Sequence, residues 1–261
     1  MVTGPRRVRI GEGVLELRHL RYFVAVAEEL NFSRAAADAR RAGAGELGRV
    51  RVGFSWSARF QTLPAIGAAF RGSHPDVALL TEEMWNARML PALRSSAIDV
   101  AVSLCPEVAS EFSYETIRSE SLVALLAATH PLGGSDALEL RALEADEFLL
   151  FPRELAPRLY DFLVGLCRRA GFEPTSRSVS FHSGWDLEIL GDVQSVALVP
   201  ASVVRDLPEG MAAVPVADPP DQIPTALVWR TDDPSPVNRA FREAARAVGW
   251  PRSAARPSAP S

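Results

Sequence analysis

The spacing of apolar residues changes along the chain, and each spacing predicts a different kind of structure. From Glu16 to Leu30, apolar residues recur every three or four positions, which predicts an amphipathic helix. Ser33 can cap a second helix, because its hydroxyl can accept a hydrogen bond from a backbone N–H of the RAAADARR segment that follows. Two helices joined by a short turn form half of a helix-turn-helix. The pattern therefore predicts a small helical head over residues 15–45.

Beyond residue 46, segments with strand and helix patterns alternate. Every second residue is apolar in RVRVGFS, which predicts a strand. The next segments predict, in order, a helix, a strand, a helix and a strand: TLPAIGAAFRGSHP, DVALLTE, NARMLPALRSS and IDVAVSL. Strands separated by helices favour a parallel sheet, because right-handed crossovers place successive strands in the same direction.

The second half of the chain repeats this order. Strands are predicted in SLVALLAATHPL, EFLLFP, SRSVSFHS, SVALVP and TALVWRTDD, and helices in LRALEAD, LAPRLYDFLVGLCRRAG, WDLEILGDVQ and SPVNRAFREAARAVG. We therefore predict an α/β fold with two parallel-sheet lobes and a ligand cleft between them. Lobe I comprises about residues 48–118 and 217–250, and lobe II comprises about residues 119–216.

The two ends of the chain lack these patterns. Residues 1–14 show no periodicity, and residues 251–261 are rich in Pro, Ser and Ala, so we predict a leader and a tail without secondary structure. The arginines of the leader fit either an over-extended start or a genuine basic arm. No apolar run reaches the roughly 18 residues of a membrane helix, and no secretory signal is recognised. We therefore expect a cytoplasmic protein without a membrane partner.

Charge is distributed unevenly between the head and the rest of the chain. Residues 1–51 contain ten arginines and six acidic residues, whereas the remainder contains eighteen arginines and twenty-six acidic residues. A basic head on an acidic body is typical of a nucleic-acid-binding module joined to a sensor, but a solvated helix surface gives the same balance. All 28 basic residues are arginine, which excludes a Walker-type GK[ST] loop and any lysine nucleophile or base.

The sequence offers little to an enzyme. The histidines and cysteines have no metal-ligand spacing, and Ser103 lacks a GxSxG motif. We interpret Glu82, Glu83 and Asp99 as surface residues rather than as a catalytic pair. We therefore predict a protein that is not an enzyme and has neither a metal nor a cofactor.

Several motifs, taken in order, resemble the LysR-type bacterial transcriptional regulators. The opening LELRHLRYFVAVAEELNFSRAA resembles the start of that family, and GELGRVRVGFS resembles the end of its linker helix and its first effector-domain strand. Further matches are LPALRSSAIDVAVS, ATHPL, FPR, AGFEP, VALVPASV and WRTDDPSP. Together they cover about residues 15–250. The resemblance implies a type 2 periplasmic-binding-protein-like effector domain over residues 46–250.

The chain departs from the family pattern within residues 35–41. There the family continues with the recognition helix, a wing and a long dimerising linker helix, whereas this chain passes directly to the end of the linker. In helix-turn-helix proteins the recognition helix contacts base edges in the major groove. Ser33 and Arg34 remain as residues able to touch a phosphate. The resemblance thus implies a DNA partner, but a head without its reading element; whether the gap is genuine stays open.

The resemblance implies an effector held near the carboxyl ends of the lobe I strands. It places Ser55, Trp56, Ser57 and Arg59 at the first strand–helix junction, where free N–H groups and a helix dipole suit a carboxylate. Ser57 is equally well explained as a helix cap. Ser103 follows the third strand at the hinge and can donate to the same ligand. These residues predict a small organic acid as the effector.

For lobe II the resemblance implies fewer polar contacts. Phe151 and Pro152 would form its wall, and Arg153 fits either an exposed charge or a ligand clamp. His182 fits either the cleft or the surface, and Trp185 fits either ring stacking or the core. The family's glycine-bearing turn has become GDVQS here, which puts the usual pocket shape in doubt.

These inferences combine into one function and one alternative. We expect a LysR-family regulator that senses a small-molecule effector in a bilobal cleft, forms a homodimer or a higher homo-oligomer, and reads DNA poorly. The alternative is a cytoplasmic small-molecule binder or modulator without DNA binding. A periplasmic solute-binding protein has the same bilobal plan, but the absent export signal counts against it.

Overall fold

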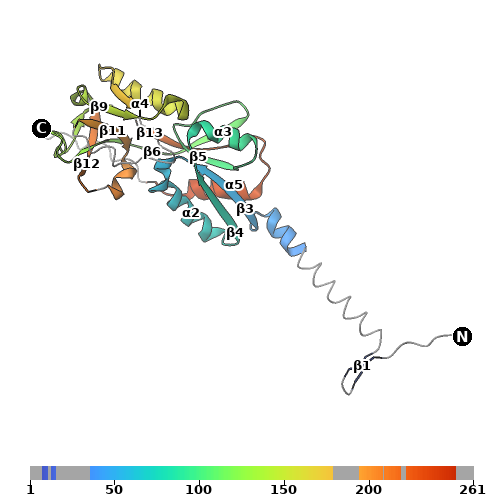
Figure 1. The fold of residues 1–261 in the computed structure, drawn as a ribbon. Helices are drawn as coiled ribbons and strands as arrows, with labels where there is room; N and C mark the ends of the chain where they lie inside the picture. The colour runs from blue at the N-terminus through green and yellow to red at the C-terminus, as the bar shows by residue number, and fades with distance from the viewer. Residues whose placement is uncertain are drawn as a thin grey trace.

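The computed structural model describes residues 8–10, 13–15, 36–178, 194–207, 209–218 and 222–250, and Figure 1 shows two lobes built around separate sheets. The elements are, in chain order, β1 (Val8–Ile10), β2 (Gly13–Leu15), β3 (Gly48–Phe54), η1 (Trp56–Arg59), α2 (Thr62–Ser73), β4 (Val77–Glu83), α3 (Asn86–Arg94), β5 (Val100–Leu104), β6 (Phe112–Glu120), β7 (Leu122–Ala127), β8 (Leu138–Glu139), η2 (Leu140–Leu143), β9 (Glu147–Leu150), η3 (Arg153–Leu155), α4 (Pro157–Arg169), β10 (Thr175–Ser178), β11 (Ser195–Pro200), η5 (Ala201–Asp206), β12 (Met211–Asp218), β13 (Ile223–Arg230) and α5 (Pro236–Ala247).

Lobe I is built on a five-stranded sheet with the strand order β4-β3-β5-β13-β6. Strands β4, β3 and β5 run parallel, as the strand–helix–strand pattern predicted, whereas β13 is antiparallel to both of its neighbours. The apolar face of the amphipathic helix α5 packs on this sheet together with α2, through a core that includes Phe70 and Phe241. Three parallel strands therefore end at one edge, where the loops into η1 and α3 begin.

Lobe II is built on a six-stranded sheet with the strand order β10-β9-β11-β7-β12-β8. Strands β9, β10 and β11 are parallel, but β7 pairs antiparallel with both β11 and β12. The α/β class is confirmed, whereas the prediction of wholly parallel sheets is wrong. The reason is that β7 and β13 each enter a sheet after crossing from the other lobe, so no crossover helix fixes their direction.

The chain crosses between the lobes twice. The first crossing joins β6 of lobe I to β7 of lobe II, and the second joins β12 of lobe II to β13 of lobe I. Glu120, at the end of β6, is buried and accepts a hydrogen bond of 3.0 Å from the backbone N–H of Ser202 in lobe II. Its carboxylate also lies 3.0 Å from the buried guanidinium of Arg118. The hinge is therefore held by a buried ion pair that touches both lobes.

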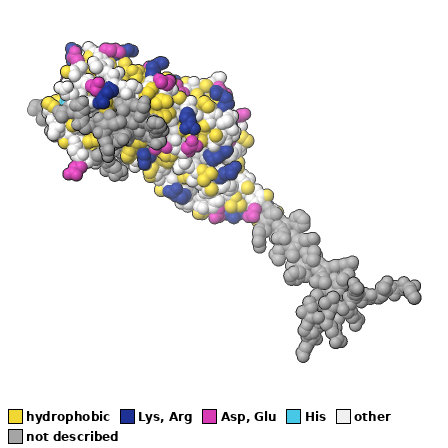
Figure 2. Space-filling view, in the orientation of Figure 1, with side chains coloured by type: hydrophobic (Ala, Val, Ile, Leu, Met, Phe, Trp, Pro, Cys, Tyr) yellow, Lys and Arg dark blue, Asp and Glu magenta, His cyan; other side chains and the backbone are white. Residues whose placement is uncertain are grey.

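Charged residues also stabilise the interior of lobe I. The carboxylate of Asp99 accepts two hydrogen bonds from the Arg51 guanidinium, at 2.7 and 3.0 Å, and one from the Arg51 backbone N–H. Asp233 accepts from Arg242 at 2.9 Å, and both side chains are almost fully buried. The interpretation of Asp99 as a surface residue was therefore wrong, because Asp99 pairs strand β5 with strand β3. On the outer face drawn in Figure 2, arginine and acidic side chains are interspersed over both lobes.

A helical segment over residues 36–43 leads into lobe I and agrees with the predicted second helix of the head. It ends in a Schellman motif: Gly45 has a positive φ of 79°, its N–H donates to Ala42, and the N–H of Glu46 donates to Arg41. A Cβ at Gly45 would lie 3.0 Å from the Pro236 carbonyl, so glycine allows this turn to contact the start of α5. Figure 1 shows the segment leading away from the body of lobe I.

The leader contains a short hairpin that the sequence analysis did not predict. Strands β1 and β2 pair antiparallel, with Ile10 opposite Gly13. Val8 and Ile10 alternate with a polar residue, and only two residues separate the strands, the first of them glycine; this pattern favours a tight hairpin. The predicted leader without secondary structure is therefore corrected at these positions. The predicted helix from Glu16 and the tail over 251–261 lie outside the described residues.

Candidate functional site

A cavity of about 160 Å³ lies between the two lobes, at the carboxyl edge of the lobe I sheet. Lobe I contributes the residues that follow β3 and β4, lobe II contributes the ends of β9 and β11 and the first turns of α4, and the hinge contributes the end of β5 and the start of β13. The lining residues are Ser55, Trp56, Ser57, Glu83, Met84, Trp85, Asn86, Arg88, Leu104, Phe151, Ala156, Leu159, Leu163, Leu198, Val199, Pro200 and Ile223.

Two serines at the first strand–helix junction have different roles. The Ser55 hydroxyl accepts a hydrogen bond of 3.2 Å from the backbone N–H of Leu104, which ties β3 to the end of β5. Ser57 is equally buried, but neither its hydroxyl nor its N–H has a hydrogen-bond partner among the described residues. It is not the helix cap, because Ser55 occupies the N-cap position of η1. Ser57 is therefore the serine available to a ligand.

The second junction, between β4 and α3, lines the same cavity. Asn86 begins α3 and is buried; its side-chain amide donates to the Leu104 carbonyl at 2.7 Å, which leaves its Oδ1 without a partner among the described residues. The backbone N–H groups of Asn86 and Ala87 likewise have no acceptor among those residues. The N-terminal end of a nine-residue helix thus presents donors to the cavity.

Glu83 adds a carboxylate to the lobe I wall. Burial raises the pKa of Glu83 above its ordinary value, while the Arg59 guanidinium, 3.6 Å from its carboxylate, acts in the opposite direction. Arg59 itself is half-exposed and is not among the lining residues. The Arg59 side chain thus turns to Glu83 and lies over the ring of Phe60, and its role as a ligand contact stays a prediction.

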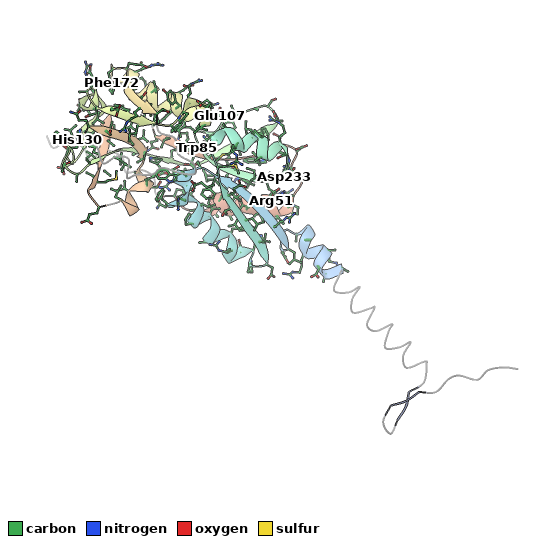
Figure 3. The ribbon with its side chains drawn as sticks, in the orientation of Figure 1. Arg51, Trp85, Glu107, His130, Phe172 and Asp233 are labelled. Atoms are coloured by element: carbon green, nitrogen blue, oxygen red, sulfur yellow. The ribbon has the colours of Figure 1, made fainter. Side chains whose placement is uncertain are left out.

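Lobe II presents an apolar wall. Phe151, Leu163 and Leu198 are all almost fully buried and line the cavity; Phe151 directly follows β9, and the other two lie on α4 and β11. Phe151 also meets Trp85 of lobe I, with ring centroids 5.3 Å apart, so aromatic rings from the two lobes touch at the floor of the cleft. Figure 3 labels Trp85 in the middle of the molecule, where the lobes meet.

Of the expected effector-binding residues that the structure describes, four line the cavity and three do not. Ser55, Trp56, Ser57 and Phe151 line the cavity, as the resemblance implied. Ser103 does not line it: its hydroxyl is buried, without a partner among the described residues, within lobe I. Pro152 is the N-cap of η3 and is also not among the lining residues. Arg153 forms an ion pair of 2.7 Å with Asp161 and is not among the lining residues.

Three further expected positions lie outside the described residues. These are His182 in the cleft and the two phosphate-contacting positions of the head, Ser33 and Arg34. Their roles remain predictions.

The sequence analysis missed the second junction. Glu83, Trp85 and Asn86 follow a predicted parallel strand and open a predicted helix, as Ser55 and Ser57 do. The carboxyl ends of parallel strands meet at one edge of a sheet, so this topology was a signal that could have found them. The strand that contains Leu198 and Pro200, β11, was predicted, but its contribution to the lobe II wall of the cavity was not.

The described part of the chain contains two buried thiols and no cluster of metal-binding side chains. Burial raises the pKa of Cys105 and of Cys167 to about 12, so both thiols stay protonated at neutral pH. Among the described residues, no group of histidine, cysteine and acidic side chains could hold a metal ion. No described helix is long and apolar enough to span a membrane.

Comparison with known proteins identifies the family. Residues 43–250 match the LysR substrate binding domain. The regulator TdfR of Cupriavidus pinatubonensis, named as an HTH-type transcriptional regulator, is 32% identical over 224 residues, which cover 83% of this chain and 74% of TdfR. This chain belongs to the LysR family of transcriptional regulators. Its relatives are regulators rather than enzymes.

Other relatives and solved structures agree with this assignment. YnfL of Escherichia coli, named as an uncharacterised HTH-type transcriptional regulator, is 28% identical over 290 residues, covering 87% of this chain and 97% of YnfL. The crystal structure of the LysR regulator CbnR matches with a TM-score of 0.75 and 21% identity, over 92% of this chain and 84% of CbnR. The BenM effector-binding domain with its effector benzoate matches with a TM-score of 0.67 and 25% identity, over 76% of this chain and 90% of that domain. The effector-domain fold of the LysR family is thereby confirmed.

Proposed function

We propose that this LysR regulator senses a small organic carboxylate in the cleft between its lobes. The observation that carries the proposal is the contrast between the two walls of the cavity. Lobe I presents unpaired donors from Ser57 and from the start of α3, whereas lobe II presents Phe151 and Leu163. A molecule with a carboxylate at one end and an apolar body at the other satisfies both walls. Benzoate, the effector in the BenM structure, has this character and supports the choice.

The carboxylate binds to lobe I in this proposal. A buried hydroxyl and free backbone N–H groups at a helix N-terminus form charge-assisted hydrogen bonds to an anion. Glu83 lies in the same wall and disfavours a second negative charge nearby. The proposal therefore specifies a monocarboxylate rather than a compact dianion.

The apolar body of the ligand lies against lobe II. A ligand held by both walls favours the lobe arrangement in which both contacts are made, because a ligand shifts an equilibrium by its difference in affinity for the two states. The two hinge crossings allow the lobes to change their angle. The helical segment 36–43 is joined to lobe I by the contact of Gly45 with Pro236, so it follows lobe I in such a change.

Binding by carboxylates and by matched amides tests the proposal. Calorimetric titration of the full chain with benzoate is expected to show binding that benzamide does not reproduce, because the neutral amide cannot form charge-assisted bonds to the same donors. Ser57→Ala is expected to weaken benzoate binding about tenfold. Equal binding of acid and amide, or an unchanged affinity in Ser57→Ala, would place recognition elsewhere.

We also infer that this chain reads DNA sequence poorly. The helix over residues 36–43 ends four residues before β3, so no recognition helix or wing can follow it. The alignment with YnfL spans 290 positions, more than the 261 residues of this chain, so YnfL contains internal residues that have no counterpart here. Without base contacts, binding is expected at the non-specific affinities of roughly 10⁻⁴–10⁻⁶ M.

A mobility-shift assay with the upstream DNA of its own gene tests this inference. The expected result is weak binding that an equal mass of unrelated DNA displaces, with a strong dependence on salt. Sub-micromolar binding that only the upstream DNA competes for would refute it.

We further infer a homo-oligomer in the cytoplasm. Supporting the inference, β4 is the edge strand of the lobe I sheet, and Leu80 on it is 48% exposed. An exposed strand edge with an apolar side chain is an available pairing surface. Leu80→Glu is expected to reduce the mass measured by light scattering, whereas an unchanged mass would exclude this edge.

A further inference from the structure

A second cavity, of about 620 Å³, opens on the outer side of the hinge. It shares a wall with the interlobe cleft, because residues that are adjacent in the chain line the two different cavities. Leu104 and Ile223 line the cleft, whereas their neighbours Cys105 and Pro224 line the second cavity. The Cys105 N–H donates to the Pro224 carbonyl at 2.9 Å and joins the two strands of this wall. We name this second cavity the hinge groove.

The hinge groove contains apolar side chains that the fold leaves in water. Among the described residues, three large hydrophobic side chains are exposed, and two of them, Val108 and Tyr114, line the groove. Tyr114 is 58% exposed on strand β6 of lobe I, and Phe162 on α4 of lobe II lines the same groove. Exposed apolar residues gathered in a concave site mark a binding surface more often than residues scattered singly do.

A positive charge lies within the same groove. Arg158, in the first turn of α4, is exposed, and its guanidinium has no hydrogen bond or ion pair with any described residue. Two other arginines of this region, Arg153 and Arg168, are paired with Asp161 and Glu173. The guanidinium of Arg158 is therefore available to an anion.

The backbone at Arg158 is fixed, which holds this side chain at the groove. Its N–H donates to the Glu107 carboxylate at 2.9 Å, and this contact joins α4 of lobe II to the loop between β5 and β6 of lobe I. Figure 3 labels Glu107 near Trp85, between the lobes. The Glu107 carboxylate also carries a negative charge beside the groove, which disfavours a ligand with more than one negative charge.

We propose that the hinge groove is a second ligand site, separate from the cleft, for an aromatic monocarboxylate. The carboxylate accepts a paired hydrogen bond from the Arg158 guanidinium, and the ring lies between Tyr114 and Phe162. The volume is within the range of small-molecule sites. The contacts of this groove are separate from those of the cleft, so binding here does not depend on the ligand of the cleft.

A ligand in the hinge groove contacts both lobes and the hinge. Arg158 and Phe162 belong to lobe II, whereas Val108 and Tyr114 belong to lobe I. The shared wall is also joined to the cleft, because the Asn86 amide donates to the Leu104 carbonyl at 2.7 Å. Occupancy of one site therefore changes the affinity of the other, and the effect is reciprocal.

Fluorine NMR of the full chain with para-fluorobenzoate as the probe separates the two sites. Wild type is expected to give two bound resonances. Arg158→Gln should lower the affinity of the groove for para-fluorobenzoate about tenfold, as followed by the groove resonance. Arg158→Lys keeps the charge but loses the planar pair of donors, so it should lower this affinity less. Tyr114→Ser, at another exposed position, should weaken the same resonance.

Ser57→Ala distinguishes failure of this proposal from failure of the cleft proposal. It should weaken the other resonance and leave the one assigned to Arg158 bound. If Arg158→Gln and Tyr114→Ser leave every bound resonance unchanged, or if wild type shows none that depends on Arg158, the hinge groove is not a site. If Arg158→Gln removes one bound resonance but Ser57→Ala changes none, only the cleft proposal is overturned.

Discussion

The two walls of the interlobe cleft differ in chemistry although they belong to lobes of the same α/β class. Lobe I ends its parallel strands in polar junctions, where Ser57, Glu83 and Asn86 lie beside free N–H groups. Lobe II closes the cleft with Phe151 and with leucine and valine side chains. The difference indicates a division of labour: lobe I orients a charged group, and lobe II removes an apolar body from water.

Truncating the apolar wall should have the largest effect. Phe151→Ala removes a fully buried ring that also contacts Trp85 of lobe I, and this is expected to lower the free energy of unfolding by about 3–5 kcal/mol. Urea unfolding measures the change, and Tyr160→Ala, a half-buried neighbour of Phe151, is the matched control with a smaller loss. A loss below about 1 kcal/mol for Phe151→Ala would show that the wall repacks and does not define the cleft.

Replacing each of the two serines by alanine in turn should separate an effect on ligand binding from an effect on stability. Ser57→Ala is expected to weaken benzoate binding by about 1–3 kcal/mol while changing stability by less than about 0.5 kcal/mol. Ser55→Ala should instead lower stability by about 1–3 kcal/mol, because it leaves the buried Leu104 N–H without its acceptor. Calorimetry and urea unfolding on both variants check this. If the two substitutions behave alike, the division between a structural and a ligand-facing serine is wrong.

Neutralising Glu83 should have the smallest effect, visible in the pH dependence of stability. Its pKa is raised in the native state, chiefly by burial, so its contribution to stability is present below the ordinary value of 4.5 and is lost as the pH rises through the native pKa. Glu83→Gln should therefore flatten the stability profile above pH 4.5. Urea midpoints measured across this range test the claim, and parallel profiles for wild type and variant would contradict it.

The sequence predicted the strands with a clear apolar or alternating pattern and missed strands that lack one. Strands β3, β5, β7 and β11 were found because they are apolar or strictly alternating. Strand β6 was missed: it lies at a sheet edge, and most of its residues are at least partly exposed. Strand β12 contains a proline, which weakens the strand pattern. Both segments form strands because they pair with neighbouring strands in the folded protein, rather than because their own sequences favour a strand.

A smaller part of the candidate site could be predicted, and it came from the family resemblance. Ser55, Ser57 and Phe151 were placed by family resemblance, whereas Trp85 and Asn86 needed the observed topology. The direction of the Arg59 side chain could not be predicted, because a long side chain can turn from a site to a nearby carboxylate and no sequence pattern fixes that choice. The hinge groove could not be predicted at all, because its wall is formed by residues from α4, β6, the loop between β5 and β6, and the crossing from β12 to β13.

A crystal structure of the full chain with bound benzoate tests the division between the walls most directly. The account predicts the carboxylate at hydrogen-bond distance from the Ser57 hydroxyl and the start of α3, with the ring against Phe151 and Leu163. A benzoate whose carboxylate faces lobe II, or a cleft that stays empty while the ligand binds elsewhere, would contradict it.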